Sequence, residues 1–209
     1  MRVLVTGFDP FGGEQVNPSY EAVRRLPDVI AGAEIIRLEL PTVFSESEIR
    51  IENAIRNCRP DIILSVGQAG GRACLTPERV AINLADARIP DNAGAQPVDL
   101  VLQPDGETAY FSTLPVKKMV QQMRAHGIPA ELSYTAGSFV CNAVMYHTLY
   151  LTAKKYPGIR AGFIHVPFVP EQCAEKPQGT PCMELQRITE GLQYAIGAAV
   201  SDGDAGTEE

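Results

Sequence analysis

A cysteine in the segment SYTAGSFVCNAVMYH, residues 133–147, has a setting that suggests covalent chemistry. Cys141 follows a segment predicted to be a strand over 130–136, then a Gly-Ser turn, and stands in the first turn of a helix predicted over 139–155. A helix N-terminus stabilises a thiolate, and strand–turn–nucleophile–helix is the order found in many hydrolases. We therefore expect Cys141 to be a nucleophile, although a buried apolar cysteine is the commoner fate of a free thiol.

The other four cysteines have weaker settings. Cys74 follows GQAGGR without a strand–turn–helix context, and Cys58 lies on the apolar face of a predicted helix. Cys173 and Cys182 flank a Pro-rich loop that offers no further ligands at zinc spacing. An odd total of five cysteines fits no disulfide framework, so we expect free thiols in a reducing cytoplasm.

A cysteine nucleophile needs a base, and the nearest histidine in sequence is unsuitable. His147 follows Cys141 by six residues in the same predicted helix, so at about 100° per residue its side chain is rotated by about 240° around the helix axis and faces another side. His126 lies in the last turn of its helix, where a cation suits the dipole and solvent. His165 instead lies near the C-terminal end of an apolar strand, at the sheet edge where Cys141 is also expected. We identify His165 as the base.

A third group should orient the imidazole, and carboxylates in apolar surroundings are few. Glu78, in TPERVAIN, is flanked by apolar residues and follows another strand end. Asp86 and Asp91 are looser alternatives. The residues alone leave these three candidates open.

The elements that must position these groups alternate along the chain. Short runs, most of them rich in Val and Ile, predict strands over 2–6, 33–40, 61–67, 130–136 and 161–168. Apolar residues at helical spacing predict helices over 45–58, 115–125, 139–155 and about 183–199. Ser45 and Glu48 have the spacing of a capping box at the start of the first of these helices. This alternation predicts an α/β fold, a single-domain α/β/α sandwich around a mixed, mainly parallel sheet.

Two stretches depart from this rhythm. Residues 72–112 carry Pro and Gly at intervals and predict a strand that leads into an exposed excursion, with a hairpin there. The acidic, small residues of 201–209 predict a disordered tail, which leaves 1–200 as one catalytic domain.

Composition excludes several classes of function. The chain has 18 Lys and Arg against 25 Asp and Glu, a net charge of −7, and no basic cluster, so nucleic-acid binding is not expected. No apolar run has the length of a membrane span. The beginning, MRVLVTGFDPFGG, has too short an apolar part for a signal peptide and is predicted to be the first strand.

Two other functions fit the same fold. Sheets of this kind with a Gly-rich turn such as VGQAGG also bind nucleosides and phosphate, as in phosphorylases, and fold alone does not decide function. No GxGxxG or Walker pattern follows the first strand, which weakens a nucleotide site there. A non-enzymatic binding module, in which Cys141 is structural, is the second alternative.

A set of motifs, taken in chain order, indicates a more specific function than the fold alone. VTGFDPFGG, NPS, PTVF, VGQAGGR, TPERVAIN, DARIPDN, YTAGSFVCN and FIHVPF with a following PEQ together resemble the pyroglutamyl peptidase I family. The resemblance extends from the first strand to about residue 172 and implies cysteine peptidases that remove an N-terminal pyroglutamyl residue from peptides. It also implies an α/β/α sandwich, no metal or cofactor, a cytoplasmic location and a homo-oligomer, the tetramer being common in prokaryotes.

The resemblance also implies roles for individual residues. Cys141 of SFVCN corresponds to the nucleophile, His165 of FIHVP to the base, and Glu78 of TPERVAIN to the acid of the triad. Arg88 of DARIPDN corresponds to the partner of the Cys141 backbone N–H at the oxyanion. The residues expected to line the pocket for the lactam ring are Phe8, Phe11, Gln68 and Phe139.

Overall fold

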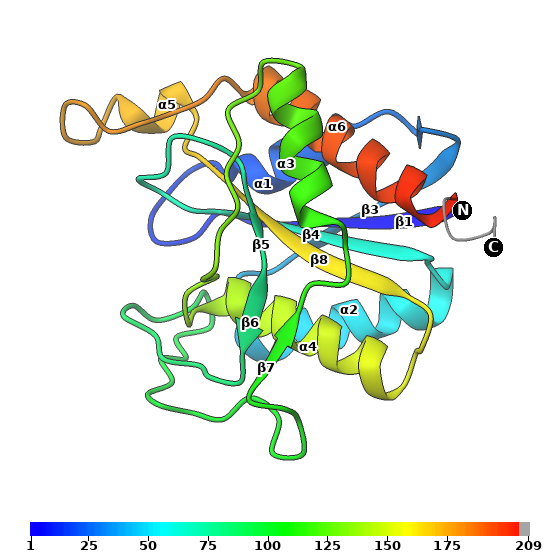
Figure 1. Cartoon of the computed structure of the whole chain (residues 1–209). Helices are drawn as coiled ribbons and strands as arrows, with labels where there is room; N and C mark the ends of the chain where they lie inside the picture. The colour runs from blue at the N-terminus through cyan, green and yellow to red at the C-terminus, as the bar shows by residue number, and fades with distance from the viewer. Residues whose placement is uncertain (205–209) are drawn as a thin grey trace.

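The structure, a computed structural model, describes residues 1–204 and is built on one six-stranded sheet (Figure 1). In spatial order its strands are β2 (Val29–Ile30), β3 (Ala33–Leu40), β1 (Arg2–Phe8), β4 (Ile62–Gln68), β8 (Arg160–Val166) and β5 (Thr76–Glu78). The four central strands are parallel, while β2 and β5 run antiparallel to their neighbours at the two edges. Because β1, β4 and β8 are almost wholly buried and mainly apolar, they need helices on both faces.

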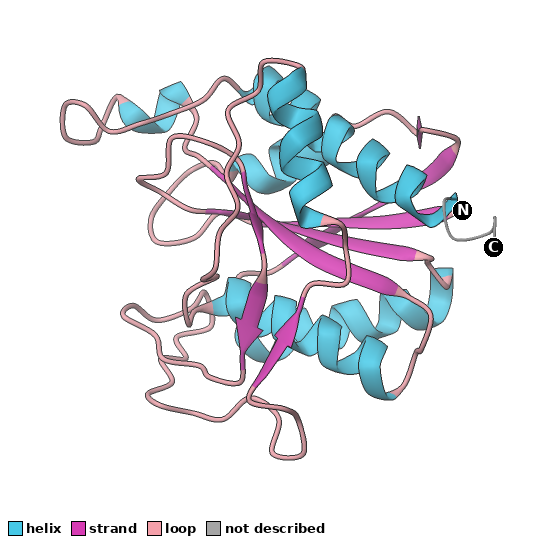
Figure 2. Cartoon of the chain, viewed as in Figure 1, coloured by secondary structure: helices cyan, strands magenta, loops and turns pink. Residues whose placement is uncertain are grey.

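Helices cover both faces of the sheet (Figure 2). They are α1 (Pro18–Val23), α2 (Phe44–Cys58), α3 (Val116–Ala125), α4 (Val140–Lys154), α5 (Pro170–Cys173) and α6 (Leu185–Asp204). Helices α1, α3 and α6 pack on one face of the sheet, and α2 and α4 pack on the other, each with its own apolar cluster. The predicted α/β/α sandwich around a mixed, mainly parallel sheet is confirmed.

The excursion predicted within 72–112 forms a small second sheet. Strand β6 (Val80–Ile82) pairs with β7 (Ala109–Phe111) antiparallel, and the loop between them extends from 83 to 108. Asn142, next to the candidate nucleophile, is buried and connects this sheet to α4 through hydrogen bonds. Its side chain accepts a hydrogen bond from Ile82 N at 3.0 Å and donates to Ile82 O and Leu84 O at 2.9 Å each.

The predicted strand over 130–136 is wrong, because this segment is extended but forms only isolated bridges. It runs parallel to the chain around β5, with backbone bonds from Glu131 N to Leu75 O and from Ser133 N to Pro77 O. In a continuous parallel ladder, the N–H of residue 77 would donate back to residue 131. Pro77 has no N–H, so the ladder is interrupted there.

The predicted capping box at the start of α2 is also wrong. The helix begins one residue earlier, at Phe44, with Val43 as N-cap and no side-chain cap of its own. The Phe44 N–H donates instead to Asp91 Oδ2 at 3.0 Å, from the middle of the excursion. At the other end of the chain α6 continues to Asp204, so residues 201–204 of the predicted tail are helical, while 205–209 lie outside the described residues.

Candidate active site

A cavity of about 600 Å³ opens where β4 and β8 end and α4 begins. This is the carboxyl edge of the parallel strands, where sheets of this type bind ligands. Six of the eight site residues predicted from the sequence line it: Phe11, Gln68, Arg88, Phe139, Cys141 and His165. The other two, Glu78 and Phe8, are buried behind the cavity wall.

Cys141 is the second residue of α4, after the N-cap residue Phe139. The chain turns into the helix at Gly137, whose φ of 77° favours glycine. The thiol lies against the sheet at Gly67, where a Cβ would come within 2.8 Å of Cys141 Sγ. Burial, and secondarily the charge of Glu78, raise the pKa of Cys141 to about 12. This effect of burial opposes the stabilisation of a thiolate that is expected at a helix start.

His165 and Glu78 form a buried pair. His165 Nδ1 lies 2.7 Å from Glu78 Oε1, and the two side chains are 5% and 0% exposed. They come from antiparallel strands, β8 and β5, with Glu78 opposite Phe163, two residues before the histidine. Burial lowers the pKa of His165, and the hydrogen bond and charge of Glu78 offset part of this effect. The contact with Glu78 through Nδ1 leaves Nε2 as the nitrogen that can exchange a proton with a reacting group.

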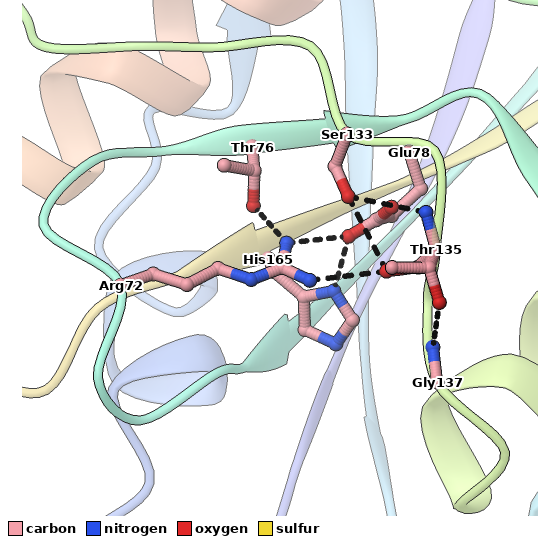
Figure 3. Close-up of polar contacts among 7 residues, drawn as sticks. All are labelled: Arg72, Thr76, Glu78, Ser133, Thr135, Gly137 and His165. Carbon is pink, nitrogen blue, oxygen red and sulfur yellow. Dashed lines mark hydrogen bonds and ion pairs between the residues drawn. The ribbon is translucent and has the colours of Figure 1, made fainter.

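Arg72, which was not predicted from the sequence, completes this network (Figure 3). Its Nη1 donates to Glu78 Oε1 at 2.6 Å and to Thr76 Oγ1, and its Nη2 donates to Thr135 O at 3.0 Å. Arg72 could have been predicted on chemical grounds. A carboxylate assigned to an apolar site needs a cation, and this arginine ends the VGQAGGR motif at a strand end.

The carboxylate of Glu78 is held ionised despite its burial. Burial raises its pKa, but the hydrogen bond and charge of His165, with smaller contributions from Ser133 and Arg72, bring the net pKa below its ordinary value. An ionised carboxylate accepts hydrogen bonds only, so it holds the His165 ring with Nδ1–H as donor.

The remaining predicted residues line the cavity, with the exception of Phe8, which lies in the core. The rings of Phe11 and Phe139 lie 6.1 Å apart on the cavity wall, and Phe44 packs edge-on against Phe139 at 5.4 Å. Gln68 Oε1 accepts from Gln172 Nε2 at 2.9 Å, which fixes the amide at the cavity. Phe8 is only 2% exposed and packs in the core against a sheet residue, so its predicted contact with substrate stays a prediction. Arg88 is exposed and lines the cavity.

The alternatives weighed from the sequence have other surroundings. Asp86 is exposed at the cavity, where its backbone N–H donates to Ser138 O at 3.0 Å. Asp91 caps α2 and closes its own turn through Ala93 N and Ala95 N. His147 contacts Gln103 at 3.1 Å and Glu48 at 3.7 Å. His126 stacks on Tyr194, on α6. In the described part of the chain, no three His, Cys, Asp or Glu side chains are placed to hold a metal ion.

Comparison with known proteins gives one consistent result. A family model described as pyroglutamyl peptidase matches residues 1–202. A pyrrolidone-carboxylate peptidase of Clostridium perfringens is 57% identical over 208 residues, which cover 99% of this chain and 97% of the relative. One of Enterococcus faecalis is 59% identical, over 96% of this chain and 93% of that protein. The crystal structure of pyroglutamyl peptidase I from Bacillus amyloliquefaciens has a TM-score of 0.92 at 50% identity, covering 95% of this chain and 94% of that one.

Proposed function

Because the chain belongs to the pyroglutamyl peptidase family, we propose that it hydrolyses the bond between an N-terminal pyroglutamyl residue and the rest of a peptide. We assign the reaction to Cys141, His165 and Glu78. One observation carries the assignment: the Cys141 thiol and the His165 ring line a single cavity, and His165 is hydrogen-bonded to a fully buried Glu78. This is the nucleophile–base–orienter order of a triad.

The first step is proton transfer coupled to attack. Because burial favours the protonated thiol, we assign to His165 Nε2 the removal of the Cys141 proton, which requires the two atoms to be within hydrogen-bond distance in the reacting complex. The thiolate then attacks the carbonyl that joins the pyroglutamyl group to the next residue. Glu78 stabilises the imidazolium that forms, because it faces Nδ1 at 2.7 Å.

The negative oxygen of the tetrahedral intermediate needs donors placed in advance. The backbone N–H of Cys141, in the first turn of α4, and the Arg88 guanidinium at the same cavity are the groups we assign to it. Collapse of the intermediate breaks the C–N bond, and His165 gives its proton to the leaving amine. Water, activated by His165, then hydrolyses the thioester and releases pyroglutamate and the free thiol.

The cavity wall favours a flat, uncharged ring. Phe11 and Phe139 supply apolar surface, and Gln68 supplies an amide for the lactam N–H or C=O. An N-terminal Gln or Glu would bring an ammonium group against these rings at a cost of several kcal/mol. We therefore propose that the enzyme selects the cyclised residue, and equal turnover of glutaminyl and pyroglutamyl chromogenic amides would contradict this.

One assay separates this function from the alternatives. The protein is treated with iodoacetamide and offered a chromogenic pyroglutamyl amide, and the alkylated cysteine is identified by peptide mapping. A peptidase loses turnover with Cys141 alkylated, a phosphorylase requires phosphate, and a binding module shows no turnover at all. We expect Cys141→Ser and His165→Ala to abolish turnover in a folded protein, while Glu78→Gln keeps a residual rate because the orienting group is the least costly loss.

A further inference from the structure

We propose that Arg72 is a positioning residue for the triad, which fixes the Glu78 carboxylate toward His165 and ties it to the chain that leads into Cys141. The inference rests on the function proposed above, and it concerns how the acid is held rather than which residues react. Arg72 follows β4 by four residues, and its side chain lies between the strand that carries the acid and the segment that precedes α4 (Figure 3).

The first arm of the guanidinium acts on the acid. A single carboxylate oxygen, Glu78 Oε1, accepts from Arg72 Nη1 at 2.6 Å and lies 2.7 Å from His165 Nδ1. Thr76, two residues earlier on β5, accepts from the same Nη1. Because Glu78 is fully buried, this charged contact and the histidine determine the rotamer of the carboxylate, and so where the imidazole points.

The second arm acts on the approach to the nucleophile. Arg72 Nη2 donates to Thr135 O at 3.0 Å, and Thr135 Oγ1 accepts from Gly137 N at 3.2 Å, at the turn before α4. This segment is extended but not part of a continuous ladder, since Pro77 interrupts its pairing with the β5 chain. The backbone still connects the two chains at Ser133, where Arg79 N donates to Ser133 O at 2.8 Å, and the Arg72 side chain adds a connection two residues nearer to α4.

The shape of the group explains why an arginine is required. A guanidinium offers two donor arms in one plane with fixed separation, whereas a lysine ammonium is one point on a flexible stem. Its charge also opposes that of Glu78: Arg72 lowers the pKa of both Cys141 and His165, while Glu78 raises both. Loss of the cation should therefore keep His165 protonated to higher pH and delay its action as a base.

A role in substrate binding would give a different result. Arg72 lines the cavity and is 27% exposed, but Nη1 and Nη2 both donate to protein acceptors. A residue that acts through Glu78 and Thr135 should change kcat and leave KM nearly constant. A residue that binds the pyroglutamyl group directly should raise KM instead.

The test compares Arg72→Met, Arg72→Lys and a matched control, Arg124→Met. Arg124 Nε donates to Ala130 O at 2.6 Å, so it ties the same extended segment to α3 without touching a carboxylate. For each folded variant, kcat and KM for a pyroglutamyl amide are measured across pH. We expect Arg72→Met to lower kcat about 10- to 100-fold with little change in KM, and to move the acidic limb of kcat/KM to higher pH.

Arg72→Lys retains the charge but cannot reach both acceptors, so we expect a smaller loss of kcat and an acidic limb close to that of the wild type. The control should stay within about two-fold of the wild type throughout. A rise in KM alone, or an equal loss of kcat in Arg124→Met, would overturn the inference. If Arg72→Met does not fold, the test rests on Arg72→Lys, and a wild-type kcat in that variant would also overturn the inference. Absence of turnover in the wild type would instead contradict the proposed function.

Discussion

At the scale of single residues, the position of Cys141, the proposed nucleophile, depends on the lack of a side chain at Gly67. Gly67 lies on β4 directly opposite His165, and Cys141 Sγ occupies the space that a side chain there would take. An added Cβ would also lie 2.7 Å from Cζ of Phe163. The glycine therefore lets the thiol and the imidazole share one small region of the sheet.

We expect Gly67→Ala to displace the thiol and to lower kcat/KM by about 10-fold or more, since a shift of about 1 Å in a reacting group can cost 100-fold. The loss of stability should be about 1–3 kcal/mol, because the core is overpacked at this point. Urea unfolding and steady-state kinetics measure the two effects.

The matched control is Gly197→Ala in α6, where an added Cβ meets nothing within 4 Å. It should leave activity unchanged and stabilise the protein by about 0.5–1 kcal/mol, because alanine favours the helix. Wild-type kcat/KM in Gly67→Ala would show that the thiol does not need this space.

Prediction from the sequence was strongest at this scale for residues whose type restricts their environment. The histidine at the end of an apolar strand and the cysteine at a helix start were both predicted to lie at the carboxyl edge of the sheet. Helical geometry excluded His147 as the base. The acid stayed open among three carboxylates until the family resemblance pointed to Glu78, because its burial depends on β5 pairing with β8. Arg72 was missed for the same reason: its two arms reach elements whose proximity is a tertiary feature.

At the scale of elements, a pair of titratable groups lies between α2 and α4, with His147 buried and Glu48 half-buried. Glu48 lies 3.7 Å from His147 Nδ1, and the charged groups around the pair include Glu52 and Lys155. Burial raises the pKa of Glu48 to about 7 and lowers that of His147 to about 4. The folded state therefore favours the neutral form of both groups, and the helix interface is least costly when neither is charged.

This makes stability depend on pH through Glu48. Its folded pKa lies above the ordinary value of 4.5, so its stabilisation is complete below about pH 4.5 and is lost as pH rises through about 7. We expect Glu48→Gln, which stays neutral, to match the wild type near pH 4.5 and to be more stable by about 1–3 kcal/mol near pH 8. Chemical unfolding at the two pH values tests this. The exposed Glu46→Gln should show no such difference, and a wild type more stable than Glu48→Gln near pH 8 would contradict the assignment.

Elements with strong local signals were predicted well, and those formed by long-range pairing were not. The Val- and Ile-rich runs of β1, β3, β4 and β8 and the periodic faces of the longer helices need no partner to be recognised. The segment 130–136 looks like a strand because apolar and polar residues alternate along it, but the missing N–H at Pro77, far away in the chain, interrupts its ladder. The short helix α1 was overlooked, although Asn17 as N-cap and Pro18 at its first position mark its start.

At the scale of the whole molecule, the fold is the one that the alternation of elements indicated, and in residues 1–204 no helix is long and apolar enough to cross a membrane. The cytoplasmic location and the homotetramer, both implied by the family resemblance, stay predictions. For the tetramer we expect light scattering after gel filtration to give about four times the chain mass of 22.6 kDa. A monomeric mass with full activity would show that each site is complete in one chain.

The three residues of the proposed triad lie far apart in the sequence, and this affects when activity appears during folding. Glu78 and Cys141 are 63 residues apart, Cys141 and His165 a further 24, and β5 joins β8 only at the sheet edge. Closing loops of this length costs conformational entropy before the contacts can form, so we expect the three groups to come together late in folding. Catalysis therefore reports the completed native topology, and no contiguous fragment of the chain short of Glu78 to His165 can contain all three groups.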